Sequence, residues 1–195
     1  MRRSTFLFVL VTVFLLLPLT PRLLRAQEVE IPVDMQVSLF SRILTFDRAL
    51  AKPARQEFVI GILYQKNVRI SSELAAELQH AADVQQVQSG GQGLRFVPLP
   101  IRDLGDVENA IKTPQLDAVY VTPLRLIDIR ALSEATRRRG ILSLTGVPEY
   151  VEKGISVGLE SAGNRAQIIV NLAAATAEGA DFSAKLLNIA RVVQR

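Results

Sequence analysis

The chain has 195 residues, a formal net charge of +4 and no cysteine. The missing cysteine excludes disulfides, a cysteine nucleophile, thiol redox control and a lipoprotein anchor. Four basic residues and no acidic residue precede Gln27, so the rest of the chain carries equal numbers of both. The basic character belongs to this leader, and we therefore expect no nucleic-acid partner for the remainder.

The first 26 residues have the pattern of a secretory signal peptide. Arg2 and Arg3 precede an apolar run over residues 6–19, which is shorter than the roughly 20 apolar residues of a membrane-spanning helix. We predict cleavage after Ala26, a single mature domain over residues 27–195, and a periplasmic location. The alternative is a retained N-terminal anchor, and only then would the protein contact the membrane.

Beyond the leader, helical and strand-like patterns alternate. Helices show apolar residues at spacings of three or four, and strands show short apolar runs between turn residues. In chain order the pattern predicts a helix over 35–50, a strand over 58–64, a helix over 71–88, a strand over 94–99, a helix over 103–112, a strand over 116–121, a helix over 126–139 and a strand over 141–144. This alternation predicts an α/β fold, a single-domain three-layer sandwich with a mostly parallel sheet.

The last forty residues predict an antiparallel hairpin and a closing helix. Two strand-like runs, 155–159 and 165–171, flank the turn residues 161–164. Asn171 then stands at the junction with an alanine-rich helix start, where it is expected to be an N-cap. After Gly179, Asp181 or Ser183 is the expected N-cap of the closing helix, and Lys185 is an expected solvated position.

This tail resembles the end of the YfiR-like family of small secreted regulators, which includes HmsC-like proteins. In that family a glycine, two strands, Asn-Leu, alanines and a second glycine precede a Ser-x-Lys-Leu-Leu helix. The positions that fall on the pattern are Gly154, Asn171, Leu172, Ala174, Gly179, Ser183, Lys185, Leu186, Leu187 and Ala190. The resemblance extends, with less specific motifs, over the strands at 58–64, 116–122 and 141–146.

The resemblance implies a non-enzymatic periplasmic regulator that acts by protein–protein contact. The best-understood relative binds the periplasmic sensor domain of an inner-membrane diguanylate cyclase and holds it inactive, which restrains cyclic-di-GMP and biofilm formation. It therefore implies an inner-membrane sensor protein as the partner, and we expect a homodimer. Two departures limit the transfer: this chain lacks the family's Trp-Pro pair after the first helix, and without cysteines it cannot share the family's redox control.

Polar, uncharged residues follow three of the predicted parallel strands. In open α/β sheets, ligands bind beyond the carboxyl ends of the strands. The candidate ligand or partner surface comprises Tyr64, Gln65, Asn67, Thr122, Pro123, Thr145 and Gly146. Such residues suit small-molecule or peptide binding better than bond breaking, although they are also ordinary turn chemistry. The alternative function is accordingly a small-molecule-binding module that resembles one lobe of an ABC-type solute-binding protein.

Other candidate sites have simpler interpretations. The run Arg137-Arg138-Arg139 precedes Gly140, where cations complement a helix C-terminus; the alternative is a docking patch for an acidic partner or for anionic lipid. His80, the single histidine, is expected on a solvated helix position. The glycines at 90–93 follow a helix rather than a strand, so they do not form a phosphate loop. We expect no catalytic residues, metal or cofactor.

Overall fold

The computed structural model describes residues 31–50, 57–85, 88–89, 92–113 and 115–193. The predicted signal peptide and its cleavage position lie outside these residues, as does part of the glycine-rich stretch at 90–93. Within the described part of the chain, no helix combines the length and the apolar character that crossing a membrane requires.

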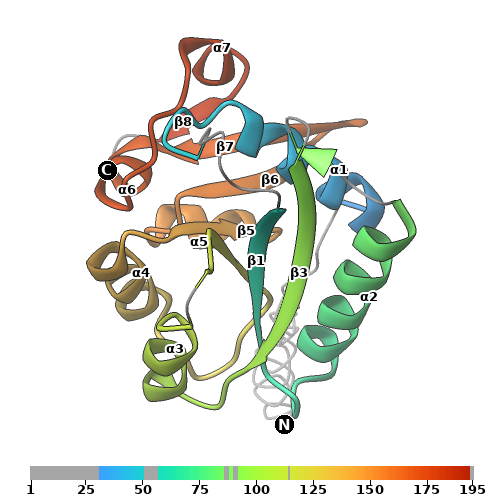
Figure 1. Cartoon of the computed structure of the whole chain (residues 1–195), viewed down its shortest axis with the longest axis vertical. Coiled ribbons are helices and arrows are strands. Elements are labelled where there is room, and N and C mark those ends of the chain that lie inside the picture. The colour runs from blue at the N-terminus through green and yellow to red at the C-terminus, as the bar shows by residue number, and fades with distance from the viewer. Residues whose placement is uncertain (1–30, 51–56, 86–87, 90–91, 114, 194–195) are drawn as a thin grey trace, which may run out of the picture.

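One eight-stranded sheet forms the centre of the molecule (Figure 1), in the order β2-β3-β1-β4-β5-β6-β7-β8. The strands are β1 (Glu57–Tyr64), β2 (Gln88–Ser89), β3 (Gln92–Pro100), β4 (Ala118–Val121), β5 (Leu142–Thr145), β6 (Val157–Ala162), β7 (Arg165–Asn171) and β8 (Arg191–Val193). Strands β3, β1, β4, β5 and β6 are parallel. At the edges, β2 is antiparallel to β3, β7 is antiparallel to β6, and β8 runs parallel to β7.

The parallel strands have a doubly wound order. From β1 the chain moves to β3 on one side, and it then crosses to β4, β5 and β6 on the other. The direction reverses between β1 and β4, so the switch point of the sheet lies at the carboxyl ends of these two strands. The predicted α/β fold with a mostly parallel sheet and a C-terminal hairpin is confirmed.

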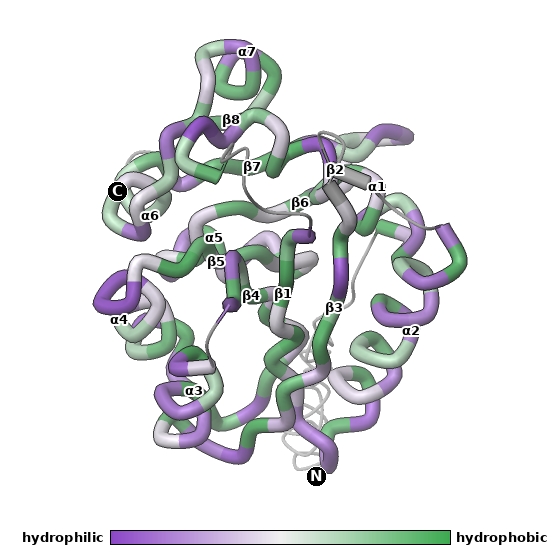
Figure 2. The backbone as a smooth tube through the Cα atoms, viewed as in Figure 1, coloured by the Kyte–Doolittle hydropathy of each residue, from purple (hydrophilic) through white to green (hydrophobic). Residues whose placement is uncertain are grey.

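Helices cover both faces of the sheet, which gives three layers (Figure 1). They are α1 (Val33–Thr45), α2 (Arg69–Gln85), α3 (Leu104–Ala110), α4 (Ile129–Arg139), α5 (Pro148–Glu152), α6 (Leu172–Ala177) and α7 (Ala184–Leu187). Alternate strand residues point to opposite faces: Tyr120 packs in a core with α1 and α2, whereas its neighbour Val121 packs with α3, α4 and α5. In Figure 2 the central strands are correspondingly green and the outer helices carry most of the purple.

Local chemistry explains where several elements begin and end. Asp103 and Asp128 are the N-caps of α3 and α4, and each side chain accepts a hydrogen bond from the first turn. Gly140 ends α4 in the left-handed conformation, with φ of 62°. The β6–β7 hairpin turns through two residues, Gly163 and Asn164, and Gly163 has φ of 65°.

The structure also corrects several predicted boundaries. The first helix ends at Thr45 rather than residue 50, and α4 begins at Ile129 because Asp128 caps it there. The closing helix is a single turn, after which Arg191–Val193 pair with β7 as an edge strand. A bidentate ion pair between Arg191 and Glu160 of β6 stabilises this extended conformation.

Candidate functional site

The predicted strand-end residues gather at one edge of the sheet. Strands β1, β4 and β5 are adjacent and parallel, so the residues that follow them lie near the switch point. Asn67 is exposed and Tyr64 is half-buried. The other five, Gln65, Thr122, Pro123, Thr145 and Gly146, are buried.

The hydroxyls at this edge bond to the protein's own chain. Thr122 Oγ1 donates to the carbonyl of Leu63 at 2.9 Å. Ser71 Oγ lies 2.6 Å from Thr122 Oγ1 and accepts from the backbone N–H of Gln65 at 2.9 Å. Thr145 Oγ1 likewise donates to the carbonyl of Val121 at 2.9 Å. These groups fasten neighbouring strands and α2 together.

Gln65 holds the loop that follows β4. Its Nε2 donates to the carbonyl of Arg125 at 3.0 Å, and its Oε1 accepts from the N–H of the same residue at 2.6 Å. The next residue, Leu126, has a positive φ of 59° and a fully exposed side chain. A left-handed conformation is rare for a bulky residue, so the loop presents an apolar side chain at some conformational cost.

A second group of polar residues surrounds the C-terminal end of α4. The predicted arrangement is confirmed in that Arg137, Arg138 and Arg139 form the last turn before Gly140. Arg137 Nη2 donates to the carbonyl of Gly154 at 3.3 Å. Arg138 pairs with Glu108 of α3 at 2.9 Å. Two of the three cations therefore tie α4 to neighbouring segments, whereas Arg139 is exposed.

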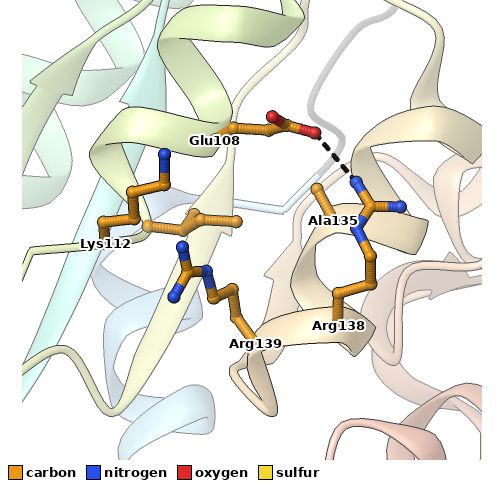
Figure 3. Close-up of a pocket in the computed structure, with 6 residues that line it drawn as sticks. Glu108, Lys112, Ala135, Arg138 and Arg139 are labelled. Carbon is orange, nitrogen blue, oxygen red and sulfur yellow. Dashed lines mark hydrogen bonds and ion pairs between the residues drawn. The ribbon is translucent and has the colours of Figure 1, made fainter.

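Two hollows flank α4. The smaller, of about 90 Å³, lies between α3 and α4 (Figure 3). It is lined by Glu108, Ile111, Lys112, Ala135, Arg138 and Arg139. The larger, of about 290 Å³, lies between α4 and the α5–β6 connection, and is lined by Arg130, Ser133, Glu134, Arg137, Glu152, Lys153, Gly154 and Asn171.

Two family-signature residues line the larger hollow, and the structure gives each a local role. Gly154 has φ of 111°, and a Cβ there would lie 2.5 Å from Ser133 Oγ. Asn171 Oδ1 accepts from the N–H of Ala174 at 3.0 Å, and its Nδ2 donates to the carbonyl of Val151 at 3.1 Å. Asn171 is therefore the N-cap of α6, as the sequence predicted.

The remaining signature residues have structural positions. Gly179 follows α6 with φ of 88°. Ser183 occupies the N-cap position of α7, but its side chain makes no capping hydrogen bond and its Oγ is buried without a partner. The ammonium of Lys185 lies 5.7 Å from the ring centroid of Phe46. Leu186 is fully buried, whereas Leu172 and Leu187 are half-buried.

The sequence analysis missed Glu178, a carboxylate with only 2% of its surface exposed. Its oxygens accept from Thr136 Oγ1 at 2.5 Å, from Ser143 N–H and Oγ at 2.8 Å each, and from Ser156 Oγ. Burial raises the pKa of Glu178, and the four hydrogen bonds oppose that rise. The carboxylate joins α4, β5, the start of β6 and the end of α6 at one buried point.

His80 is exposed on α2, as expected. Within the described ranges, no three His, Cys, Asp or Glu side chains converge as metal ligands would.

Comparison with known proteins identifies a family that this chain matches. A family model described as YfiR/HmsC-like matches residues 34–191. No curated protein matches the chain. Among solved structures, a conserved domain protein from Vibrio cholerae O1 biovar El Tor is 16% identical, with a TM-score of 0.58 over 84% of this chain and 60% of that one. An ABC domain in complex with L-Trp from Streptococcus pneumoniae is 13% identical, with a TM-score of 0.59 over 83% and 62%. At these identities the likeness concerns the fold, and the chain spans about three fifths of either structure.

Proposed function

Because the chain belongs to the YfiR/HmsC-like family, matched over residues 34–191, we propose that it is a non-enzymatic periplasmic regulator of an inner-membrane sensor. It acts by protein–protein contact, and by the family resemblance its partner is the periplasmic sensor domain of a diguanylate cyclase. Bound regulator holds the cyclase inactive, so release raises cyclic-di-GMP and promotes biofilm formation. The predicted signal peptide delivers the protein to that compartment, and a homodimer is the proposed form.

The family match is the observation that carries this proposal, and the candidate site supports it. The hydroxyls and the amide at the carboxyl ends of the parallel strands are used in hydrogen bonds within the chain. A catalytic site would instead need groups free to reach a substrate. The outer surface offers what a binding protein needs, including the displayed Leu126 and the cations around α4.

Recovery of a membrane partner tests the proposal. The full chain, exported from its own cell with a C-terminal tag, is purified from solubilised membranes beside an unrelated tagged periplasmic protein. We expect specific recovery of a membrane protein with a periplasmic domain, and a rise in cyclic-di-GMP when the gene is deleted. If no specific partner is recovered and deletion leaves cyclic-di-GMP unchanged, the proposed function is wrong.

Small-molecule binding, the alternative, has weaker support. The likeness to the L-Trp complex concerns the fold alone. In addition, both the nitrogen and the oxygen of the Gln65 amide already form hydrogen bonds with the backbone of Arg125. A thermal-shift screen of metabolites separates the two functions. Strong stabilisation by one metabolite would favour the binding module over a purely protein-contacting regulator.

A further inference from the structure

The two hollows beside α4 concentrate positive charge. Six cations line them against three carboxylates, Glu108, Glu134 and Glu152. We call the six the α4 cationic surface: Lys112, Arg130, Arg137, Arg138, Arg139 and Lys153. The dipole of α4 offsets only about half a unit charge at its C-terminus. A surplus of positive charge therefore remains after the helix end has been neutralised.

The smaller hollow has two cations without an acidic partner. Its single carboxylate, Glu108, is held by Arg138. Lys112 Nζ reaches only the side-chain oxygen of Asn109, at 3.3 Å, and among the described residues Arg139 forms no ion pair. Figure 3 shows Lys112 and Arg139 on the same side of the hollow, away from the Glu108–Arg138 pair. The buried side chains of Ile111 and Ala135 also line it, and an incoming carboxylate would find two cations with which to pair.

The larger hollow contains an unused donor. Arg137 is held in place by its hydrogen bond to Gly154, but its Nε–H is buried and has no partner among the residues that the structure describes. A buried donor left unpaired is costly. Lys153, whose ammonium lies 5.8 Å from the ring centroid of Tyr150, adds a second cation to this hollow. A carboxylate bound in this hollow would pair with the two cations that line it, Arg137 and Lys153, through charge-assisted hydrogen bonds.

From these observations we infer that the α4 cationic surface binds an acidic segment of a partner protein, with carboxylates entering the hollows on the two flanks of the helix. One extended segment that crosses α4 can reach both hollows. A lipid surface fits less well, because stable membrane association also needs apolar side chains that insert. In the described part of the chain the exposed large apolar residues are Met35, Val84, Leu126 and Ile189, and none of them lines either hollow.

For the identity of the partner, the inference rests on the proposed function: the acidic segment belongs to the membrane sensor. The binding chemistry can be tested without that partner. The exported protein, labelled with ¹⁵N, is titrated with a short synthetic peptide rich in Asp and Glu, and with its Asn and Gln counterpart. We expect shifts at residues 108–112, 130–139 and 152–154 with the acidic peptide alone, which weaken as salt is added.

Charge reversal with a matched control locates the site. The double variant Lys112→Glu and Arg139→Glu places two carboxylates in the smaller hollow. The control, Arg42→Glu and Lys66→Glu, changes the net charge equally at two exposed positions that line neither hollow. We expect the first variant to weaken peptide binding at least about tenfold and the control to weaken it far less. Thermal unfolding of each variant verifies that it is folded, and the milder Arg139→Gln replaces the double variant if it is not.

Each outcome decides the inference. Equal losses in the two variants, or no binding of the acidic peptide at low salt, would overturn it. Binding of vesicles that contain phosphatidylglycerol, without binding of the peptide, would replace the protein segment by a lipid surface. If the double variant recovers the membrane partner as well as the unmodified protein does, docking at α4 is wrong while the regulatory function stands. If the unmodified protein recovers no partner and deletion of its gene leaves cyclic-di-GMP unchanged, the regulatory function is wrong, and the peptide titration then tests the α4 cationic surface alone.

Discussion

Glu178 is a buried carboxyl group whose pKa is raised by burial, so its protonation couples the stability of the fold to pH. Because burial raises its pKa in the folded protein above the usual 4.5, the native state keeps its proton at a pH where the unfolded chain has lost it. Folding stability therefore falls as pH rises from about 4.5 to the raised native pKa, by about 1.4 kcal/mol per pH unit within that window.

Replacing Glu178 by Gln removes this titration and keeps the shape of the side chain. As pH rises above about 4.5, we expect the unmodified protein to lose stability that the variant keeps. The free energy of unfolding of the variant should therefore increase relative to that of the unmodified protein. Urea unfolding between acidic and neutral pH measures the difference. Glu134→Gln, which removes a carboxylate at an exposed position of α4, is the matched control. If the unfolding free energies of Glu178→Gln and of the unmodified protein changed in parallel with pH, the raised pKa of Glu178 would be contradicted.

Alanine substitutions at Gly154 and Gly179 distinguish the cost of backbone strain from the cost of steric overlap. Both have positive φ values, 111° and 88°, so alanine is strained at either position. A Cβ at Gly154 would also lie 2.5 Å from Ser133 Oγ and 2.7 Å from Arg137 Nη2, whereas a Cβ at Gly179 meets nothing within 4 Å. We expect Gly179→Ala to cost about 1 kcal/mol and Gly154→Ala about 2–4 kcal/mol of unfolding free energy. Equal costs in urea unfolding would show that the close contact is easily relieved.

At the scale of elements, the segment before α7 is fastened to the end of α1. Asp47, 1% exposed, accepts from the N–H groups of Ala49 and Asp181 at 2.9 Å each. Arg48 N–H donates to the carbonyl of Asp181, and Ser183 N–H donates to the carbonyl of Phe46. The three contacts that involve Asp181 and Ser183 join residues more than 130 positions apart, so the segment before α7 depends on the end of α1 for its conformation.

Asp47→Ala tests this connection. It leaves two backbone N–H groups without their acceptor, and we expect a loss of about 1–3 kcal/mol in the free energy of unfolding. Asp47→Asn retains an oxygen at the same place and should lose less. Urea unfolding ranks the variants, and amide exchange at Asp181 should accelerate more in the alanine variant. Equal destabilisation by both substitutions would mean that the charge, rather than the hydrogen bonds, matters.

Elements with a strong local pattern could be predicted from the sequence, and those defined by distant partners could not. The apolar run of β1 and the capped helix α4 can be recognised from their own local sequence. The strand β8 forms by pairing with the free edge of β7, which its own sequence does not reveal. The helix α5 has only five residues, too few for a clear helical pattern. In its local sequence Glu178 is an ordinary glutamate at the end of a helix. The groups that hydrogen-bond to it come from α4, β5 and the residue before β6, which are distant in the sequence. The strand-end residues do follow β1, β4 and β5, but the hydrogen bonds that they form involve side chains such as Ser71, which no local pattern links to Thr122.

At the scale of the whole molecule, the two cores share the same strands. Within β4, Tyr120 packs on the α1–α2 side and Val121 on the α3–α4 side. The two faces also hold one buried tyrosine each: Tyr120, which donates to Gln36 Oε1 at 2.7 Å, and Tyr150, whose hydroxyl accepts from the N–H of Leu124 at 2.9 Å. Loss of either core would leave a bare face of the sheet, so we expect both cores to unfold together.

Fluorotyrosine labelling follows the two faces separately by ¹⁹F NMR during urea unfolding. We expect the native signals of Tyr120 and Tyr150 to disappear at one common urea concentration. Leu132→Ala, a fully buried change on α4, should lower that midpoint by the equivalent of about 2–5 kcal/mol. Because the strands couple the faces, the signal of Tyr120 on the opposite side should shift by the same amount as that of Tyr150. Separate midpoints, or a shift confined to Tyr150, would mean that the α4 side can open while the α1–α2 core stays folded, and the surface around α4 would then be the mobile half of the molecule.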